Sequence, residues 1–202
     1  MLKVGLTGSI AVGKSHVCSV LRELGCHVLD ADLTAREVVA KGTPGLASIV
    51  REFGEGILTD TGALDRKKLG AIVFADKEKR EKLNSIVHPL VIEAQDRWIR
   101  DVEMTDSQGI AVIDAALMIE SGGYKRFNKL IVVWCESAIQ LERLKHRDGL
   151  SESDATLRIA AQMPQDEKKQ FADHLIDTSR SFEDTRSQVA EVVKKLKLFM
   201  AD

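Results

Sequence analysis

One stretch near the start of the chain limits what the chain can fold into. Residues 8–15 read Gly-Ser-Ile-Ala-Val-Gly-Lys-Ser and match the pattern G-x-x-x-x-G-K-[ST], the P-loop. A short apolar run at residues 4–7 precedes the loop and suits a buried parallel strand. Apolar residues then recur at the spacing of one helix face, at Val17, Val20, Leu21 and Leu24. The pattern predicts a strand, a phosphate-binding loop and a helix in that order.

The loop residues predict the binding of ATP with Mg²⁺. Gly8 and Gly13 have no Cβ, so the backbone can turn tightly and its N–H groups can point at a phosphate beside a helix N-terminus. Lys14 is expected to reach the β- and γ-phosphates, and the Ser15 hydroxyl is expected to hold Mg²⁺. The predicted nucleotide contacts in this loop are Gly8, Ala11, Val12, Gly13, Lys14, Ser15 and His16.

Composition is that of an ordinary globular protein. The 202 residues are 44% hydrophobic and 30% charged, which favours one soluble domain with inserted parts. The net charge of −2 provides no overall basic field, so we expect no nucleic-acid partner. No apolar run reaches the length of a membrane span, and we expect no signal peptide, since the first apolar stretch is short and leads directly into the P-loop. We therefore expect a cytoplasmic protein without membrane contact, as a monomer or small homo-oligomer.

The three cysteines do not indicate a disulfide framework or a metal site. Cys18, Cys26 and Cys135 are odd in number and form no C-x-x-C pair. Small buried thiols in a reducing compartment are the expected interpretation.

Five predicted strands alternate with helices along the chain. They cover residues 4–7, 26–30, 110–114, 129–135 and 174–177. This order indicates an α/β protein of the P-loop NTPase fold, with a five-stranded parallel sheet and helices on both faces. We expect the core at about residues 1–59, 103–137 and 171–202, a helical insertion at about 60–102 and a helical lid at about 138–170. His88-Pro89 is expected to bend or break the insertion's helix.

Three aspartates lie at or just past the carboxyl ends of predicted strands, where ligands bind in sheets of this kind. Asp32 is the better candidate to orient an acceptor hydroxyl and take its proton, and Asp30 could help to hold Mg²⁺ through water. Asp114 has the place of a Walker B carboxylate that supports Mg²⁺. Helix capping by Asp30 and Asp32, and a simple turn role for Asp114, remain open alternatives.

The predicted lid carries basic side chains at helical spacing. Arg143 and Arg147 lie four residues apart on one predicted helix, and Arg158 and Gln162 do so on the next. Guanidinium groups placed over a P-loop stabilise the charge of a transferred phosphoryl group, and a lid also excludes water. A solvated charged face is the alternative. For His88 the general expectation is a structural role.

Taken in order, these motifs resemble the dephospho-CoA kinase family over essentially the whole chain. The matching pieces are residues 6–15, Asp30-Ala31-Asp32 with Ala35-Arg36, Leu64-Asp65-Arg66, His88-Pro89, Arg143 with Arg147, residues 158–163, and Ile176-Asp177. The resemblance implies ATP-dependent phosphorylation of the ribose 3′-hydroxyl of dephospho-CoA, the last step of coenzyme A synthesis. It implies that the insertion helps to bind the acceptor and that residues 138–170 form the lid.

The resemblance also implies roles for single residues. Asp32, Lys14 and Arg147 would be catalytic, with Arg143 and Arg147 on the nucleotide. The acceptor would be bound by Asp32, Arg36, His88, Arg158 and Gln162, and the metal would be held by Ser15, Asp30 and Asp114.

Three positions depart from the family's usual pattern. Ala115-Ala116 stands where a Pro-Leu-Leu run is usual, His16 replaces the usual threonine, and Thr178 replaces asparagine. The departure at Ala115-Ala116 concerns the acceptor pocket, and the departure at Thr178 concerns the contacts to adenine.

The alternative function is that of another small-molecule P-loop kinase, which would act on a nucleoside or nucleotide. A GTPase-type switch is rejected, since Asn128-Lys129 lacks the base-reading context and Asp106-Ser107-Gln108-Gly109 precedes its strand.

Overall fold

The computed structural model describes residues 1–201. The chain divides into two compact units. The first, called the sheet unit, is formed by Met1–Asp30 and Asp101–Asp202; the second, called the helical unit, is Ala31–Arg100. Each unit is described by itself.

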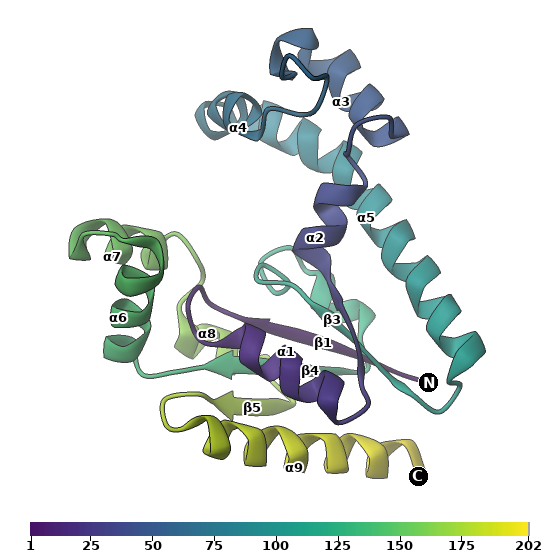
Figure 1. Ribbon diagram of the computed structural model, residues 1–202, viewed down its shortest axis with the longest axis vertical. Coiled ribbons are helices and arrows are strands. Elements are labelled where there is room, and N and C mark those ends of the chain that lie inside the picture. The colour runs from purple at the N-terminus through teal and green to yellow at the C-terminus, as the bar shows by residue number, and fades with distance from the viewer. Residues whose placement is uncertain (202) are drawn as a thin grey trace. The chain divides into compact units, whose positions relative to one another are not determined.

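The sheet unit contains the parallel sheet that the sequence predicts. All its strand pairs are parallel, in the spatial order β2-β3-β1-β4-β5 (Figure 1). The strands are β1 (Leu2–Gly8), β2 (His27–Asp30), β3 (Ile110–Asp114), β4 (Lys129–Trp134) and β5 (His174–Asp177). The apolar runs explain this arrangement, because β3 is buried along its whole length, as a strand covered on both faces must be.

Helices α1 (Lys14–Glu23) and α9 (Phe182–Ala201) lie side by side over one face of this sheet (Figure 1). Their apolar faces join the strands in one core, which includes Val17, Leu21, Val189 and Leu196. The remaining elements of the unit are η2 (Gly123–Arg126), α6 (Ser137–Asp148), α7 (Glu152–Ala160) and α8 (Gln165–Lys169). All three cysteines are free and buried, as expected.

The helical unit has its own apolar cluster. Its elements are α2 (Ala31–Glu37), α3 (Pro44–Phe53), η1 (Glu55–Ile57), α4 (Arg66–Ala75) and most of α5 (Lys77–Thr105). The cluster centres on Val39, Ile49, Ile57 and Leu69. The unit therefore begins at Ala31, and it includes the helix at residues 44–53 that the sequence analysis assigned to the core. The function of this unit stays a prediction.

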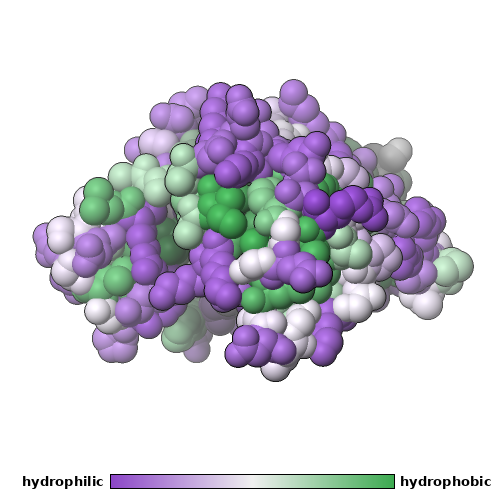
Figure 2. Space-filling model, turned by 90° about the horizontal axis from the view of Figure 1, so that it is seen from above, coloured by the Kyte–Doolittle hydropathy of each residue, from purple (hydrophilic) through white to green (hydrophobic). Residues whose placement is uncertain are grey.

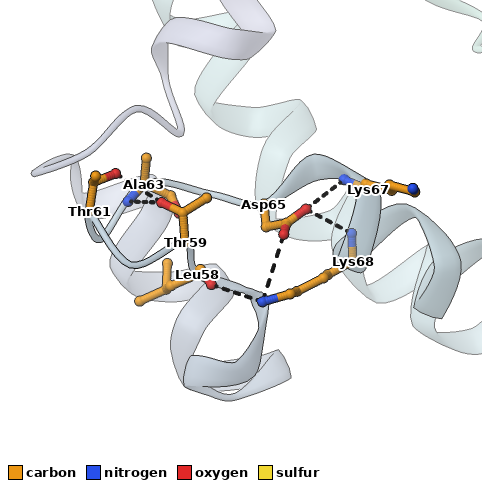
Figure 3. A network of polar contacts seen from close by, with 7 residues as sticks. All are labelled: Leu58, Thr59, Thr61, Ala63, Asp65, Lys67 and Lys68. Atoms are coloured by element: carbon orange, nitrogen blue, oxygen red, sulfur yellow. Dashed lines mark hydrogen bonds and ion pairs between the residues drawn. The ribbon is translucent and has the colours of Figure 1, made fainter.

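Local chemistry fixes the start of α4 (Figure 3). Asp65 accepts hydrogen bonds from the backbone N–H groups of Lys67 and Lys68, at 3.1 and 3.0 Å, and so caps the helix. The preceding turn is closed by Thr59, whose backbone and hydroxyl bind Ala63. The capping carboxylate accepts hydrogen bonds in its charged form, and these bonds lower the pKa of Asp65.

The expected break at His88-Pro89 is wrong. Helix α5 runs without interruption from Lys77 to Thr105, with Pro89 inside it. Proline removes the hydrogen bond to the carbonyl of Ser85, four residues earlier. Ser85, His88 and Pro89 are all exposed, so water can satisfy that carbonyl and the helix continues.

Among the helices of residues 1–201, none combines the length and the apolar character that a bilayer span requires. On the face shown in Figure 2, hydrophilic residues cover most of the surface and hydrophobic residues gather in smaller areas between them. Exposed apolar side chains such as Phe74 and Met104 are common on protein surfaces, and Leu198 and Phe199 near the end of α9 form an adjacent exposed pair.

Candidate active site

The P-loop connects β1 to α1 and needs both of its glycines. A Cβ on Gly8 would lie 2.5 Å from the carbonyl oxygen of Val133, so no larger residue fits there. Gly13 has a φ of 82°, in the left-handed region that glycine adopts without strain. Helix α1 begins at the next residue, Lys14, so its N-terminal N–H groups face the loop.

Lys14 forms an ion pair with Asp114, the last residue of β3. Its Nζ lies 2.5 Å from Oδ1 of that carboxylate. The other oxygen, Oδ2, accepts a weak hydrogen bond from the thiol of Cys18 at 3.3 Å. Burial, and next the neighbouring carboxylate, raise the pKa of the Cys18 thiol to about 12, so the thiol stays protonated and can donate. Asp30 lies opposite Asp114 in the β2–β3 register.

The donors at this edge of the sheet fit Mg²⁺. Among residues 1–201, no group of three or more His, Cys, Asp and Glu side chains could hold a metal ion alone. Magnesium does not need such a group, because it binds through one or two carboxylates or hydroxyls together with substrate phosphates and water. The hydroxyl of Ser15 is exposed at the start of α1, and Asp30 and Asp114 supply carboxylate oxygens.

Thr178, one of the three departures from the family pattern, joins the P-loop to α6. Its hydroxyl donates to the carbonyl of Val12 at 2.7 Å. It also accepts a 3.0 Å hydrogen bond from Arg143, whose other nitrogen donates to the Thr178 carbonyl at 2.7 Å. Arg143 therefore lies beside the P-loop. His16, in the first turn of α1, contacts Phe182 with ring centroids 4.6 Å apart and ring planes tilted by 59°.

Arg147 and Arg158 share a different partner. Both guanidinium groups donate to Asp148, Arg147 in a two-bond arrangement at 2.8 and 3.1 Å and Arg158 at 2.9 Å. Hydrogen bonds from Arg147 lower the pKa of the Asp148 carboxyl and raise that of Arg147. Arg143 and Arg147 share a helix, but the structure directs them to different groups.

Gln162 does not lie on the same helix as Arg158, because α7 ends at Ala160. The backbone turns there, with the N–H of Gln162 donating to Ile159. This turn brings the Gln162 side chain to the P-loop, where its Oε1 accepts a 2.8 Å hydrogen bond from the N–H of Ile10. The prediction of a helical pair was wrong, while the position of Gln162 beside the phosphate loop is a finding of the structure.

Two buried polar residues near this site were not among the predicted site residues, although Gln140 belongs to the segment that carries the family resemblance. Gln140 on α6 donates from Nε2 to the carbonyl of Ile10 at 2.8 Å and is only 2% exposed. A polar residue one turn before the buried Leu144 on the same helix face was the signal available for it.

Lys168 is the second missed residue, and it is fully buried. Its Nζ contacts the carboxylate of Glu120 and the carbonyl of Ala116, each at 2.8 Å. Thr7, just before the P-loop, donates to the same carbonyl at 3.2 Å. No pattern in the sequence marks Lys168, which stands among other charged residues of a short helix.

The remaining predicted site residues belong to the helical unit. Asp32 lies in the first turn of α2, and Arg36 lies one turn later on the same helix. The carbonyl of Arg36 accepts a 3.3 Å hydrogen bond from Arg66, and burial followed by the charge of Arg36 lowers the pKa of Arg66. His88 is exposed on α5. The roles assigned to these residues stay predictions.

Comparison with known proteins identifies relatives along nearly the full chain. The family model described as dephospho-CoA kinase matches residues 2–184. A dephospho-CoA kinase of Shouchella clausii is 45% identical over 196 residues, covering 96% of this chain and 98% of that protein.

Two solved structures are similar in fold. The crystal structure of TT1252 from Thermus thermophilus has a TM-score of 0.84 and 29% identity, and covers 96% of this chain and 97% of its own. A dephospho-CoA kinase from Campylobacter jejuni has a TM-score of 0.70 and 28% identity, with 96% of both chains covered. These similarities confirm the predicted fold class.

Proposed function

The chain belongs to the dephospho-CoA kinase family, and on this premise we propose how its residues perform the family's reaction. It is an ATP-dependent phosphotransferase that converts dephospho-CoA to coenzyme A by phosphorylating the ribose 3′-hydroxyl, the last step of coenzyme A synthesis. The observation that carries this conclusion is the extent of the match, because residues 2–184 include the P-loop, the helical unit and the predicted lid.

The P-loop would hold the phosphates of ATP. Lys14 would leave its ion pair with Asp114 and follow the charge of the γ-phosphoryl group as the bond to the β-phosphate breaks. Contacts from Gly8 and residues 11–16 would hold the rest of the triphosphate. Arg143 lies beside the loop through Thr178, in a place suited to the nucleotide.

Arg147 would reach the transferred group from the lid. Its guanidinium is 55% exposed, and the only partner it has within residues 1–201 is the adjacent Asp148, so a phosphate could replace that partner at little cost. Such a replacement on lid closure would place positive charge where the transition state is most negative.

We propose Ser15, Asp114 and Asp30 as the residues that hold Mg²⁺, the first two directly and Asp30 through water. When bound, the ion neutralises phosphate charge and orients the triphosphate. Oxygen donors are the ligands that Mg²⁺ prefers.

Asp32 would act on the acceptor. Its carboxylate would accept a hydrogen bond from the ribose 3′-hydroxyl, orient the hydroxyl oxygen toward the γ-phosphorus, and take the proton as the new P–O bond forms. Arg36 and His88 of the helical unit, with Arg158 and Gln162 of the lid, would bind the rest of dephospho-CoA. Residues of about 60–102 would form most of that acceptor-binding part.

For the whole protein we propose a cytoplasmic enzyme that acts as a monomer or small homo-oligomer and has no nucleic-acid partner. The net charge of −2 supports the last point, because nucleic-acid binding is driven largely by excess positive charge. The free cysteines are consistent with a reducing compartment.

An acceptor screen tests the proposed function. The purified protein is incubated with ATP and Mg²⁺ and with dephospho-CoA, adenosine, AMP or shikimate in turn, and ADP release is measured. The proposal predicts a kcat/KM for dephospho-CoA that exceeds every other value by roughly 100-fold or more, because only this acceptor engages the whole helical unit. Preference for a nucleoside or nucleotide would overturn it in favour of another small-molecule kinase.

A further inference from the structure

Ile10, at the tip of the P-loop, is held at both of its backbone polar groups by side chains from the predicted lid segment, residues 138–170. Its N–H donates to Oε1 of Gln162, and its carbonyl accepts from Nε2 of Gln140, both at 2.8 Å. These two hydrogen bonds are here called the glutamine clamp. They span 152 and 130 residues of sequence, so they tie two distant parts of the chain together.

The orientation of the Gln140 amide follows from its partners. The N–H of Cys135 can only donate, so the atom of Gln165 that it contacts at 3.1 Å is Oε1. Gln165 therefore presents Nε2 to Gln140, at 2.8 Å, which makes the contacted atom of Gln140 its Oε1. The Nε2 of Gln140 is then left to donate to Ile10. Each hydrogen bond in this series fixes the orientation of the next side chain. The Gln140 amide, which is 2% exposed, therefore has one orientation that satisfies its partners.

The residue after Ile10 is strained. Ala11 has a φ of 60°, and it is the only non-glycine residue among residues 1–201 with a positive φ. Such a conformation persists only where the surroundings hold the adjoining peptide groups. The carbonyl that Gln140 binds belongs to the peptide joining Ile10 to Ala11. One peptide beyond the Ala11–Val12 peptide, the carbonyl of Val12 is held by Thr178.

We propose that Gln140 and Gln162 are positioning residues of the phosphate site, which hold Ile10 so that Ala11 keeps its left-handed conformation and the loop keeps its phosphate-binding shape. The proposal rests on the proposed function in one respect, that the P-loop binds the phosphates of ATP. Because both glutamines belong to the lid segment, the shape of the loop depends on how that segment sits on it.

The experiment measures nucleotide binding without turnover. Binding of ADP with Mg²⁺ is followed by calorimetry in the intact protein and in Gln140→Met, which keeps the size of the side chain but leaves the partly buried Ile10 carbonyl without this donor. We expect ADP affinity to fall about tenfold, because the carbonyl loses its hydrogen-bond partner and the loop can reach another partner or water only by changing shape. Dephospho-CoA affinity should change less than about twofold, since its proposed site lies mainly in the helical unit.

A matched control is Gln170→Met, an exposed glutamine at the end of α8. It should leave ADP affinity unchanged. If Gln140→Met lowers the melting temperature but leaves ADP affinity per folded molecule intact, the glutamine is only structural and the proposal is wrong. If the unchanged protein itself fails to bind ADP, the proposed function fails first, so the two failures are distinguishable.

A double-mutant cycle tests the link to Ala11. Glycine adopts a φ of 60° without strain, so Ala11→Gly needs the clamp less. The proposal predicts that Gln140→Met lowers ADP affinity by a smaller factor in the Ala11→Gly protein than in the original one. An equal factor in both backgrounds would contradict a role in holding Ala11.

Discussion

At the scale of single residues, the carboxylates after the strands divide into two kinds. Asp114 is nearly buried and already paired with Lys14 and Cys18, so its place is fixed by the sheet unit. Asp32 is exposed in the first turn of α2, where an aspartate can also serve as a helix cap. Asp32 could therefore act on the acceptor hydroxyl or cap α2. The two roles predict opposite effects of substitution on turnover and on stability, so an experiment can separate them.

For Asp32→Asn we expect kcat to fall by about 10²–10⁴ with little change in melting temperature. Asparagine caps a helix about as well as aspartate, but it cannot accept the proton of the acceptor hydroxyl. Steady-state kinetics and thermal melting are measured for Asp32→Asn and Asp32→Ala together. Normal turnover in Asp32→Asn, with lost stability only in Asp32→Ala, would show that Asp32 is a cap.

The buried thiols predict a loss of stability at alkaline pH. Burial raises the pKa of Cys26 to about 11 from an ordinary value of 9.0, so the folded state keeps a proton that the unfolded chain releases. A raised pKa stabilises the fold fully below pH 9, and that contribution is lost as the pH rises through 9 toward 11. We expect Cys26 alone to account for about 1 kcal/mol of the loss between pH 8 and pH 10.

Urea unfolding at pH 8 and pH 10, in the original protein and in Cys26→Ala, measures this loss. The substitution removes the titrating group, so the stability of Cys26→Ala should fall less between the two pH values. Equal losses in the two proteins would show that the thiol does not titrate differently on unfolding.

At the scale of elements, the sequence predicted what local chemistry decides. Helix caps depend on local chemistry, because a cap needs only neighbours within one turn. The capping side chains are Thr43, Asp65, Asp76, Ser151 and Ser181, residue types that favour this position. The prediction of a break at Pro89 was wrong, because the free-energy cost of a proline in a helix depends on whether water can reach the carbonyl that loses its hydrogen bond. The glutamine clamp could not be predicted, since it depends on where α6 and the turn after α7 meet the P-loop.

Lys168 joins α8 to the loop after β3, and its removal should destabilise the sheet unit. Lys168→Met keeps most of the volume but leaves the Glu120 carboxylate and the Ala116 carbonyl without their buried partner. We expect the free energy of unfolding to fall by about 3 kcal/mol. The neighbouring Lys169→Met, which loses an i,i+3 pair with the exposed Asp166, should lose about 1 kcal/mol or less. Equal losses in urea unfolding would contradict this account.

The lid segment is expected to close over the ligands. Two of its arginines, Arg147 and Arg158, are held by ion pairs with the exposed Asp148 rather than by a packed core, so these side chains can exchange partners at low cost. Hydrogen exchange in residues 143–163 should slow when a non-hydrolysable ATP analogue and dephospho-CoA are both bound, while exchange in α9 stays the same. Equal exchange in residues 143–163 with and without ligands would indicate a fixed helix pair.

At the scale of the whole molecule, the chain joins a sheet unit that carries the P-loop and a helical unit that carries Asp32 and Arg36. The fold class could be predicted because five apolar strands alternate with helices and one motif fixes the first connection. The family could be recognised because its motifs occur in order in both units, and the match over residues 2–184 confirms it. The partners of single side chains, such as Thr178 on Val12, could not be read from the sequence because they form only on folding.

The position of the transferred phosphate tests the central claim most directly. The protein is incubated with ATP, Mg²⁺ and dephospho-CoA, and the product is examined by phosphorus NMR beside authentic coenzyme A, with Lys14→Ala as the inactive control and the exposed Lys194→Ala as the active one. Our account predicts one new phosphomonoester on the ribose 3′-oxygen, formed roughly 100-fold or more slowly by Lys14→Ala and at the original rate by Lys194→Ala. A product phosphorylated elsewhere, or no product from dephospho-CoA while ATP is consumed with another acceptor, would contradict it.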